Sequence, residues 1–415
     1  MRIAEIDGLV KSPQMAIADT HIEVIDCLDD LSRIRDEWNA VQDACDHKHV
    51  FLDHRFISAW WRHLGRGKSM HTLVLRRGGS VEGIVPLALS RGWEAFPTTE
   101  KNIRIAEDFH YIPSMRWRRV VPIRRLTFPL SFPSSNLRAH FLMRAPDREQ
   151  IEAVLSYCRE IRKHWDLLSL DGIPEGSEQE ALISEAAPRF DLQRGKSRHS
   201  RTLLRAALPP TMEAFLKERS HNFRSGLKRA LRQSIDKTAA LGDFQIREFR
   251  GASMNEGMAR LFDLELQSWK TRTTRKRELH MVLNDEHRSF YRDVATAFAA
   301  SDAAQVLVTE IGGRPANALF SLERQGMITC VLTYQAEEFS RLVTVAPLWS
   351  RFFEIAINRG LREVDFNGNS AYLARYANQE ARFSRLTFYN GAFYSSLLRG
   401  TADAAHVLAH KLARR

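Results

Sequence analysis

The chain has 415 residues and a formal net charge of +11, with 44% hydrophobic and 27% charged residues. This composition is typical of a folded protein and excludes a low-complexity or disordered chain, and the length allows two or three domains. The four cysteines lie far apart and fit neither a disulfide framework nor a zinc site, so we expect no metal.

The N-terminal segment carries no targeting information that can be read. Residues 1–20 alternate charged and small side chains and show no secretory signal. No run of about 18 apolar residues is present, so the sequence predicts no membrane-spanning helix. We expect a cytoplasmic protein whose positive charge allows peripheral contact with the anionic inner surface of the membrane.

The first half of the chain predicts a helix, a hairpin, a helix and a strand. An aromatic helical stretch at 56–61 precedes two strands within 73–87, which are joined by Gly78 and Gly79. Adjacent glycines allow the positive φ angles of a tight hairpin turn. A helix at 151–163 then leads into a strand at 165–171.

The middle of the chain reads as a connection followed by a basic helix. Residues 194–201 lack apolar periodicity and predict an exposed linker. The stretch 212–240 then shows an apolar stripe at helical spacing with a basic opposite face. With the basic loop at 270–277, it is a candidate docking surface for an anionic partner.

The second half repeats the order of the first. An aromatic helix at 261–269, a hairpin at 307–321 with its own Gly-Gly turn, a helix at 348–359 and a strand at 361–367 follow one another. Two copies of one unit are the economical interpretation. We therefore predict an α/β fold with mixed sheets in two tandem domains, and a C-terminal tail. The domain bounds are 1–200 and 201–396, with a basic amphipathic tail at 397–415 that either lies on anionic lipid or packs against the protein.

The second half resembles the CelD/BcsL family of GNAT-like acyltransferases and, more distantly, FemAB-type double-GNAT transferases. The resemblance rests on the order of five segments: 220–229, 264–269, the second hairpin, 333–339, and 360–369 with Tyr372. It implies tandem GNAT-like domains, a bacterial enzyme of lipid metabolism or the cell envelope, and an acyl thioester as donor. The chain departs from the family at 344–348, which lacks the usual glycine, and at Leu373, where a lysine is usual.

The resemblance also implies where the chemistry lies. The strands at 327–335 and 362–366 should splay apart, with the acyl chain between them. Asp365 is the first candidate for a base or for a carboxylate that orients the ammonium group, because an apolar pocket would raise its pKa, or it caps a turn. Tyr334 lines the acyl channel or fills core space. Glu265 faces the acceptor amine or is exposed to solvent.

Further candidates would serve the leaving group and the donor. Tyr372 and Tyr376 are candidates for the acid that protonates the thiolate, or are buried structural tyrosines. Arg341 and Arg375 are candidate phosphate contacts, or solvated arginines. Asn367 is a candidate hydrogen-bond donor at the donor site, or shapes a turn beside Gly368.

We therefore expect an amide-forming N-acyltransferase that uses acyl-CoA, or an acyl carrier protein, without a metal. The acceptor is an amino-lipid, such as a long-chain sphingoid base, or an envelope amino sugar. One alternative is a FemAB-like aminoacyl transferase that uses charged tRNA, and another is a non-catalytic binding protein on a GNAT scaffold. Nucleic acid is otherwise not expected, because the basic stretches lack interleaved aromatic residues.

Overall fold

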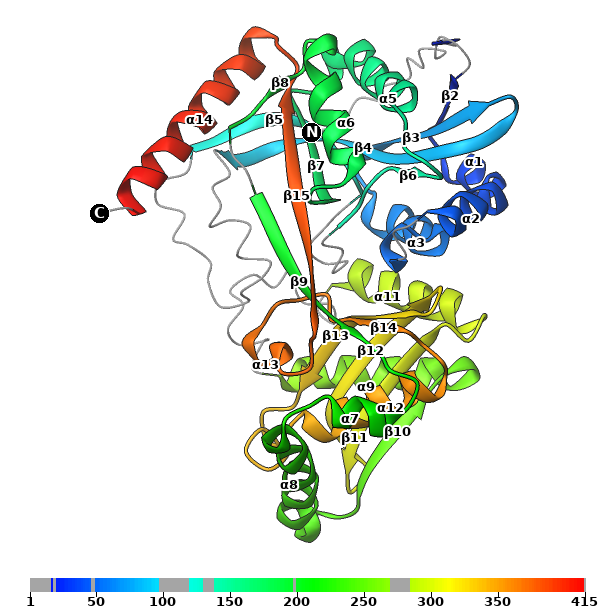
Figure 1. Ribbon diagram of the computed structural model, residues 1–415, viewed down its shortest axis with the longest axis vertical. Coiled ribbons are helices and arrows are strands. Elements are labelled where there is room, and N and C mark those ends of the chain that lie inside the picture. The colour runs from blue at the N-terminus through cyan, green and yellow to red at the C-terminus, as the bar shows by residue number, and fades with distance from the viewer. Residues whose placement is uncertain are drawn as a thin grey trace.

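Among the described residues, one mixed sheet of 15 strands carries both halves of the chain (Figure 1). The computed structural model describes residues 16–17, 20–45, 49–96, 119–129, 138–196, 199–268 and 284–413. Trp269 and the basic loop at 270–277 lie outside these residues. The predicted α/β class with a mixed sheet is confirmed. Among the described helices, none has the length and apolarity needed to cross a membrane.

The first half is an antiparallel meander followed by a helix and a parallel strand. Its elements in chain order are β1 (Ala16–Ile17), β2 (Thr20–Ile25), α1 (Leu28–Arg33), α2 (Arg35–Ala44), α3 (His54–Leu64), β3 (Lys68–Arg77), β4 (Ser80–Phe96), β5 (Arg119–Thr127), β6 (Leu142–Met143), α5 (Arg148–Glu160), β7 (Leu167–Pro174) and α6 (Glu178–Ala186). Strands β2 to β5 pair in antiparallel order, and β7 runs parallel to β5.

The second half has the same plan. Its elements are β10 (Phe244–Phe249), α9 (Met254–Gln267), α11 (Asp285–Ala299), β11 (Ala304–Ile311), β12 (Arg314–Arg324), β13 (Met327–Gln335), α12 (Ala346–Asn358) and β14 (Glu363–Asp365). Strands β10 to β13 form the meander, and β14 runs parallel to β13. The predicted repeat of one αβ unit is therefore confirmed.

The Gly-Gly turns lie where the sequence placed them. Gly78 and Gly79 join β3 to β4 with φ of 57° and 83°, and Gly312 and Gly313 join β11 to β12 with φ of 54° and 75°. All four angles lie in the left-handed region that glycine adopts without steric cost. Glycine is therefore the residue that permits both tight hairpins.

Two strands cross between the halves. Strand β9 (His199–Ala207) follows the first unit in the chain but pairs with β14 of the second. Strand β15 (Gln379–Tyr389) follows the second unit but pairs with β7 of the first, and β9 and β15 also pair with each other. Each half of the sheet is thus completed by a strand from the other half of the chain. The predicted boundary at residue 200 falls at the start of β9.

The predicted single basic helix at 212–240 is wrong in one respect, since the structure has two helices there. Helix α7 (Met212–Lys217) ends and α8 (His221–Thr238) begins after Ser220, whose hydroxyl accepts a hydrogen bond from the Phe223 amide. Such a side-chain cap stabilises the start of a new helix. The basic face is present, because Lys228, Arg229 and Arg232 are exposed on α8.

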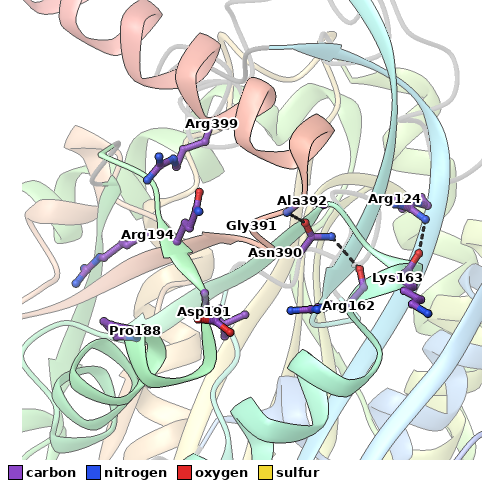
Figure 2. Close-up of a pocket in the computed structure, with 12 residues that line it drawn as sticks. Arg124, Arg162, Lys163, Pro188, Asp191, Arg194, Asn390, Gly391, Ala392 and Arg399 are labelled. Carbon is purple, nitrogen blue, oxygen red and sulfur yellow. Dashed lines mark hydrogen bonds between the residues drawn. The ribbon is translucent and has the colours of Figure 1, made fainter.

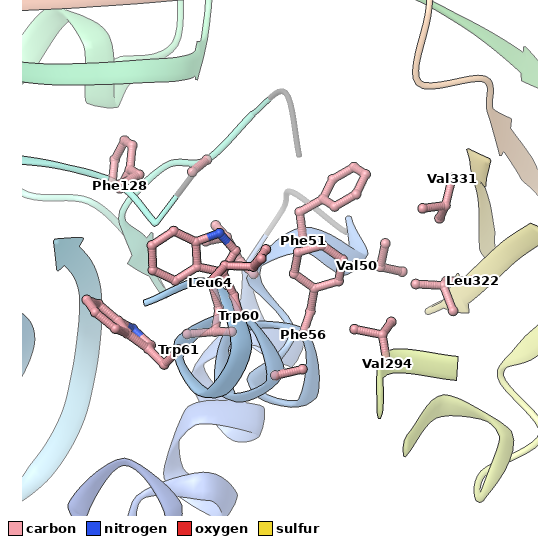
Figure 3. Packing of buried hydrophobic residues seen from close by; sticks show 14 of the residues in the cluster. Val50, Phe51, Phe56, Trp60, Trp61, Leu64, Phe128, Val294, Leu322 and Val331 are labelled. Atoms are coloured by element: carbon pink, nitrogen blue, oxygen red, sulfur yellow. The ribbon is translucent and has the colours of Figure 1, made fainter. Parts of the chain in front are cut away.

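A shared hydrophobic core holds the halves together (Figure 3). Figure 3 shows Val294, Leu322 and Val331 of the second half facing Val50 and Phe56 of the first. The Phe56 ring on α3 also meets the Phe290 ring on α11 edge-on, with 5.3 Å between centroids. This core removes apolar surface of both halves from water, so the halves stabilise each other.

We predict that Gly172→Ala lowers the free energy of unfolding by about 2 to 4 kcal/mol. Gly172 in β7 has φ of +92°, and a Cβ there would lie 2.2 Å from Cα of Arg138. Gly176→Ala is the matched control, because φ is +74° but no atom lies within 4 Å of its Cβ position. The control should lose only about 1 kcal/mol from backbone strain. Urea unfolding measures both, and equal losses would contradict the close approach.

Candidate functional site

Strands β13 and β14 pair over a short length and then separate. Their parallel register joins Met327 to Glu363 and ends where Thr329 meets Asp365. Beyond this point β13 continues to Gln335, and no described strand pairs with the edge that faced β14. The predicted separation of these two strands is confirmed, and beyond Thr329 this edge of β13 has no partner strand among the described residues.

A β-bulge lies on β13 just beyond the separation. The register with β12 shifts between Phe320 and Ser321, which pair with Leu332 and Cys330, so that Val331 is the extra residue. Bulges interrupt strand pairing and re-aim neighbouring groups, and they occur often beside active sites. The pairing register of β13 with β12 is therefore irregular just beyond the point where β13 and β14 separate.

The corresponding place in the first half is built differently. Strand β5 ends at Thr127, the same residue where its pairing with β7 ends. Its register with β4 shows no shift along its length. The described part of the first half therefore has neither the continuing strand edge nor the bulge, and the two copies of the unit are not equivalent.

Two predicted residues, Glu265 and Tyr334, lie together on one face of β13. The Tyr334 hydroxyl donates a hydrogen bond to Oε1 of Glu265 over 3.2 Å, and the two residues are only 7% and 3% exposed. Burial and the Glu265 carboxylate raise the pKa of Tyr334 well above its usual range. The alternative that Glu265 is solvent-exposed is wrong, because the end of α9 is fixed against β13 by the bridge between Ser268 and Ala336.

Tyr372, on the short helix α13 (Ala371–Ala374), approaches β13 from the other face. Its hydroxyl lies beside Thr333, and side chains of consecutive strand residues point to opposite faces, so Thr333 and Tyr334 face apart. The residue is 41% exposed, yet burial around the hydroxyl raises its pKa to about 12. Neighbouring Cys330 is buried, and burial raises the pKa of its thiol well above the usual range, so it stays protonated.

Tyr376 has a different setting from Tyr372. It is 2% exposed, and its ring stacks on Phe353 at 5.8 Å and meets Phe223 edge-on at 5.5 Å. Burial raises its pKa to about 12 as well. Of the two tyrosines predicted as acids, Tyr376 belongs to an aromatic core and Tyr372 lies at the gap.

Asp365 does not have the apolar surroundings that the sequence predicted. Its carboxylate lies 2.8 Å from the guanidinium of Arg138 and 3.2 Å from that of Arg205. The side chains of Asp365 and Arg138 are fully buried, and burial lowers the pKa of Arg138 although Asp365 opposes that shift. The predicted apolar pocket is thus wrong, since two guanidinium groups lie against the carboxylate. This arrangement suits a positioning residue better than a base.

Asn367 shapes the turn after β14. Its backbone N–H donates to Oδ1 of Asp365 over 2.8 Å, and its φ of 50° lies in the left-handed region. This geometry is an Asx turn, in which an aspartate side chain accepts from the amide two residues on. Of the two alternatives for Asn367, the turn is the one that the contacts describe.

The two predicted phosphate contacts lie on the surface, one before α12 in the chain and one at the end of α13. Arg341 precedes α12 and Arg375 ends α13, and both side chains are exposed. Neither takes part in an ion pair with another described residue. Val345, the first cap position of α12, supplies no side-chain hydrogen bond to the helix start. The first-turn N–H groups therefore have no side-chain cap, which is the setting in which helix starts bind anions.

Sequence reasoning missed part of this site. Arg138 and Arg205, the partners of Asp365, lie in segments where no pattern marked them, because a single buried arginine leaves no periodic signal. The bulge at Val331 could be identified only from the pairing register of β12 and β13. Thr333 begins one of the segments that carried the family resemblance, and that position was the available signal.

Comparisons with known proteins agree with this architecture. A family model described as Acetyltransferase (GNAT) domain matches residues 225–378, which include Glu265, Tyr334 and Tyr372. FemX is similar in fold at 9% identity and a TM-score of 0.54, covering 88% of this chain and 98% of that chain. A conserved protein of unknown function from Bacteroides thetaiotaomicron VPI-5482 shows 8% identity and a TM-score of 0.50, covering 88% of this chain and all of that chain (100%).

A tandem GNAT protein from the clavulanic acid biosynthesis pathway shows 13% identity and a TM-score of 0.45, covering 89% of this chain and 99% of that chain. No curated protein matches the sequence. The chain thus has a tandem GNAT-like fold with a GNAT domain in its second half. Membership of the CelD/BcsL family stays a prediction.

We predict that Asp365→Asn destabilises the protein by about 3 to 5 kcal/mol, because it removes the buried counter-charge of Arg138 and one of the two carboxylates that pair with Arg205. Glu363→Gln is the matched control, since Glu363 pairs with the same Arg205 at 3.1 Å but its side chain is 26% exposed. The control should lose about 1 kcal/mol or less. Thermal and urea unfolding compare the two. Full stability of Asp365→Asn with loss of activity would contradict the positioning role and restore that of a base.

Proposed function

We propose that this protein is an N-acyltransferase that moves an acyl group from a thioester to an amine in its second half. The observation that carries the proposal is the edge of β13, which continues beyond Thr329 and bulges at Val331. Such an edge offers N–H and C=O groups to an extended ligand that contains amides, as an added strand would. The pantetheine arm of an acyl thioester is a ligand of that kind.

The donor that fits these residues is acyl-CoA, with an acyl carrier protein as the alternative that shares the pantetheine arm. Donor phosphates would bind at the uncapped start of α12, with Arg341 and Arg375 as exposed cations. Residues 344–348 stand where the CelD/BcsL family, which the chain resembles, usually carries a glycine. Asn367 would contribute through the turn that it shapes rather than through its side chain.

The catalytic roles follow from the two faces of β13. The thioester supplies an activated carbonyl that an amine nitrogen attacks. Glu265, a buried carboxylate held by Tyr334, would bind the acceptor ammonium and take its proton. Tyr372, at the gap on the opposite face, would donate a proton to the leaving sulfur.

We propose an amino-lipid, such as a long-chain sphingoid base, or an envelope amino sugar as the acceptor. Both classes present one primary amine, which a buried carboxylate recognises as an ammonium ion. The first half of the chain would help to hold the remainder of the acceptor, since the shared core of Figure 3 places it against β12 and β13.

A second candidate function is aminoacyl transfer from charged tRNA. The observation that favours it is the exposed basic face of α8, together with the likeness in fold to FemX. A non-catalytic binding protein on the same scaffold is the third candidate. Full cellular function of a Tyr372→Phe variant would favour that one.

The direct experiment measures thiol release. The protein is incubated with acetyl-CoA or palmitoyl-CoA and with sphinganine or glucosamine, and free thiol is followed together with the mass of the amide product. We expect release that requires both the protein and one of the amines. Absence of release with every pair, combined with amide formation from aminoacyl-tRNA, would contradict acyl-CoA as the donor.

We predict that Tyr372→Phe lowers kcat about 100-fold, as expected when a general acid is removed, and leaves the thermal midpoint within about 2 °C of the wild type. Tyr376→Phe is the matched control and should keep kcat, because its ring packs in the aromatic core. With a pKa of about 12, Tyr372 stays protonated at neutral pH, so its proton is lost only in strongly alkaline solution. The ratio of wild-type to variant rates should therefore stay constant between about pH 7 and 10. A ratio that falls with pH over that range would contradict the acid role.

A further inference from the structure

A strongly basic pocket lies between the first half of the chain and the start of the C-terminal helix (Figure 2). Its volume is about 800 Å³, and five basic side chains and one acidic side chain line it. The basic residues are Arg124, Arg162, Lys163, Arg194 and Arg399, and the acidic one is Asp191. They come from β5, the turn after α5, β8 (Gln193–Arg194) and the C-terminal helix α14 (Phe393–Ala413).

Most of this positive charge is not balanced by the described residues. Arg124 forms an ion pair with Asp166, and Asp191 pairs with Arg159 at 3.1 Å. The other four basic side chains of the pocket take part in no ion pair within the described ranges. Cations held around one concave surface repel each other and raise the local concentration of anions. The pocket therefore suits a ligand that carries negative charge.

The side chain of Asn390 fixes the shape of the pocket. It is buried, with 4% of its surface exposed, at the turn between β15 and α14. Its Nδ2 donates to the carbonyl of Arg162 over 2.8 Å, and its Oδ1 accepts from the amide of Ala392 over 2.9 Å (Figure 2). The backbone that carries Arg162 is thus held against the start of α14, and the basic wall is preorganised.

The pocket is separate from the donor site proposed above. It lies where α5 ends and β7 begins, whereas the donor phosphates would bind where α12, the equivalent helix of the second half, begins. None of the residues that line the pocket belongs to α12 or to the residues proposed to bind the donor.

The first turns of α14 add exposed apolar side chains beside the pocket. Phe393, next to the lining residue Ala392, is 87% exposed, and Leu397 one turn later is 57% exposed. The opposite side of the helix packs against the protein through Leu398, which contacts a small cluster with Tyr389. A helix with exposed large apolar residues beside unbalanced cations is typical of proteins that bind at a membrane interface.

We propose that this pocket binds the phosphate headgroup of an anionic phospholipid in a membrane surface, with Phe393 and Leu397 entering the lipid. The cations supply the attraction to the headgroup, and the two apolar side chains supply the contact that a soluble phosphate or a nucleic acid would not require. On this proposal both sequence alternatives for the C-terminal segment apply, because α14 packs against the protein on one side and would meet lipid on another.

Vesicle co-sedimentation tests the proposal, with vesicles of phosphatidylcholine alone or with about 30% phosphatidylglycerol. We expect the wild type to bind the anionic vesicles at least tenfold more strongly than the neutral ones, since each cation near the surface adds to the attraction. The double variant Arg162→Gln/Arg399→Gln and the double variant Phe393→Ser/Leu397→Ser should each lose about tenfold. The control Lys228→Gln/Arg232→Gln removes the same charge from α8 and should stay within about twofold.

Equal binding to both vesicles, or an equal loss in the α8 control, would overturn the proposal. So would a pocket variant that loses binding to an RNA oligonucleotide while it keeps binding to vesicles. Circular dichroism and the thermal midpoint of each variant serve as the control for folding. Thiol release with water-soluble glucosamine should be unchanged in the pocket variant, so failure here is distinguishable from failure of the proposed acyl transfer.

Discussion

The buried ion pairs of Asp365 are the constraint on which the rest of this structure depends. Asp365 ends β14 at the last residue paired with β13, Arg205 comes from the crossing strand β9, and Arg138 comes from the first half of the chain. The Arg138 guanidinium also lies over the rings of Phe51 and Phe383, at 5.2 Å and 5.6 Å. One carboxylate thus joins both halves at the point where the two central strands separate. Because a buried charge without partners is costly, the three side chains fix one another.

The crossing of β9 and β15 links the same two halves through the sheet. Each half of the sheet needs a strand from the other half of the chain, so neither half closes its sheet alone. The common core of Figure 3 adds apolar contacts to the same interface. We infer that the halves fold and unfold as one unit. The gap beside β13 is therefore held by contacts from the entire chain, which is how a site gains the rigidity that positioning requires.

The sequence predicted what is local and missed what is distant. The Gly-Gly turns and the order of helices and strands have short-range signatures, and the structure confirms them. The separation of β13 and β14 was expected from the family resemblance and not from a local pattern. The surroundings of Asp365 were predicted wrongly, because the arginines that pair with it are far away in the chain and carry no periodic pattern. Ser220 is a residue type that often caps helices, but the apolar spacing continues on both sides of it. The end of α7 and the start of α8 were therefore not predicted.

The site residues also divide into those that the sequence could select and those whose role depends on packing in the fold. The hydrogen bond between Glu265 and Tyr334 agrees with their selection from one family resemblance, whereas the contrast between Tyr372 and Tyr376 depends on packing that only the fold reveals. The crossings of β9 and β15 were beyond prediction, because the partner of a strand is set by topology rather than by its own sequence.

We propose that this duplicated unit has kept its donor site in one copy alone. The second half has the continuing strand edge and the bulge, and the described part of the first half has neither. A crystal structure with a non-hydrolysable acetyl-CoA analogue tests this most directly. The account predicts pantetheine density along β13 beyond Thr329, with the phosphates at the start of α12. Density between β5 and β7 instead would contradict it.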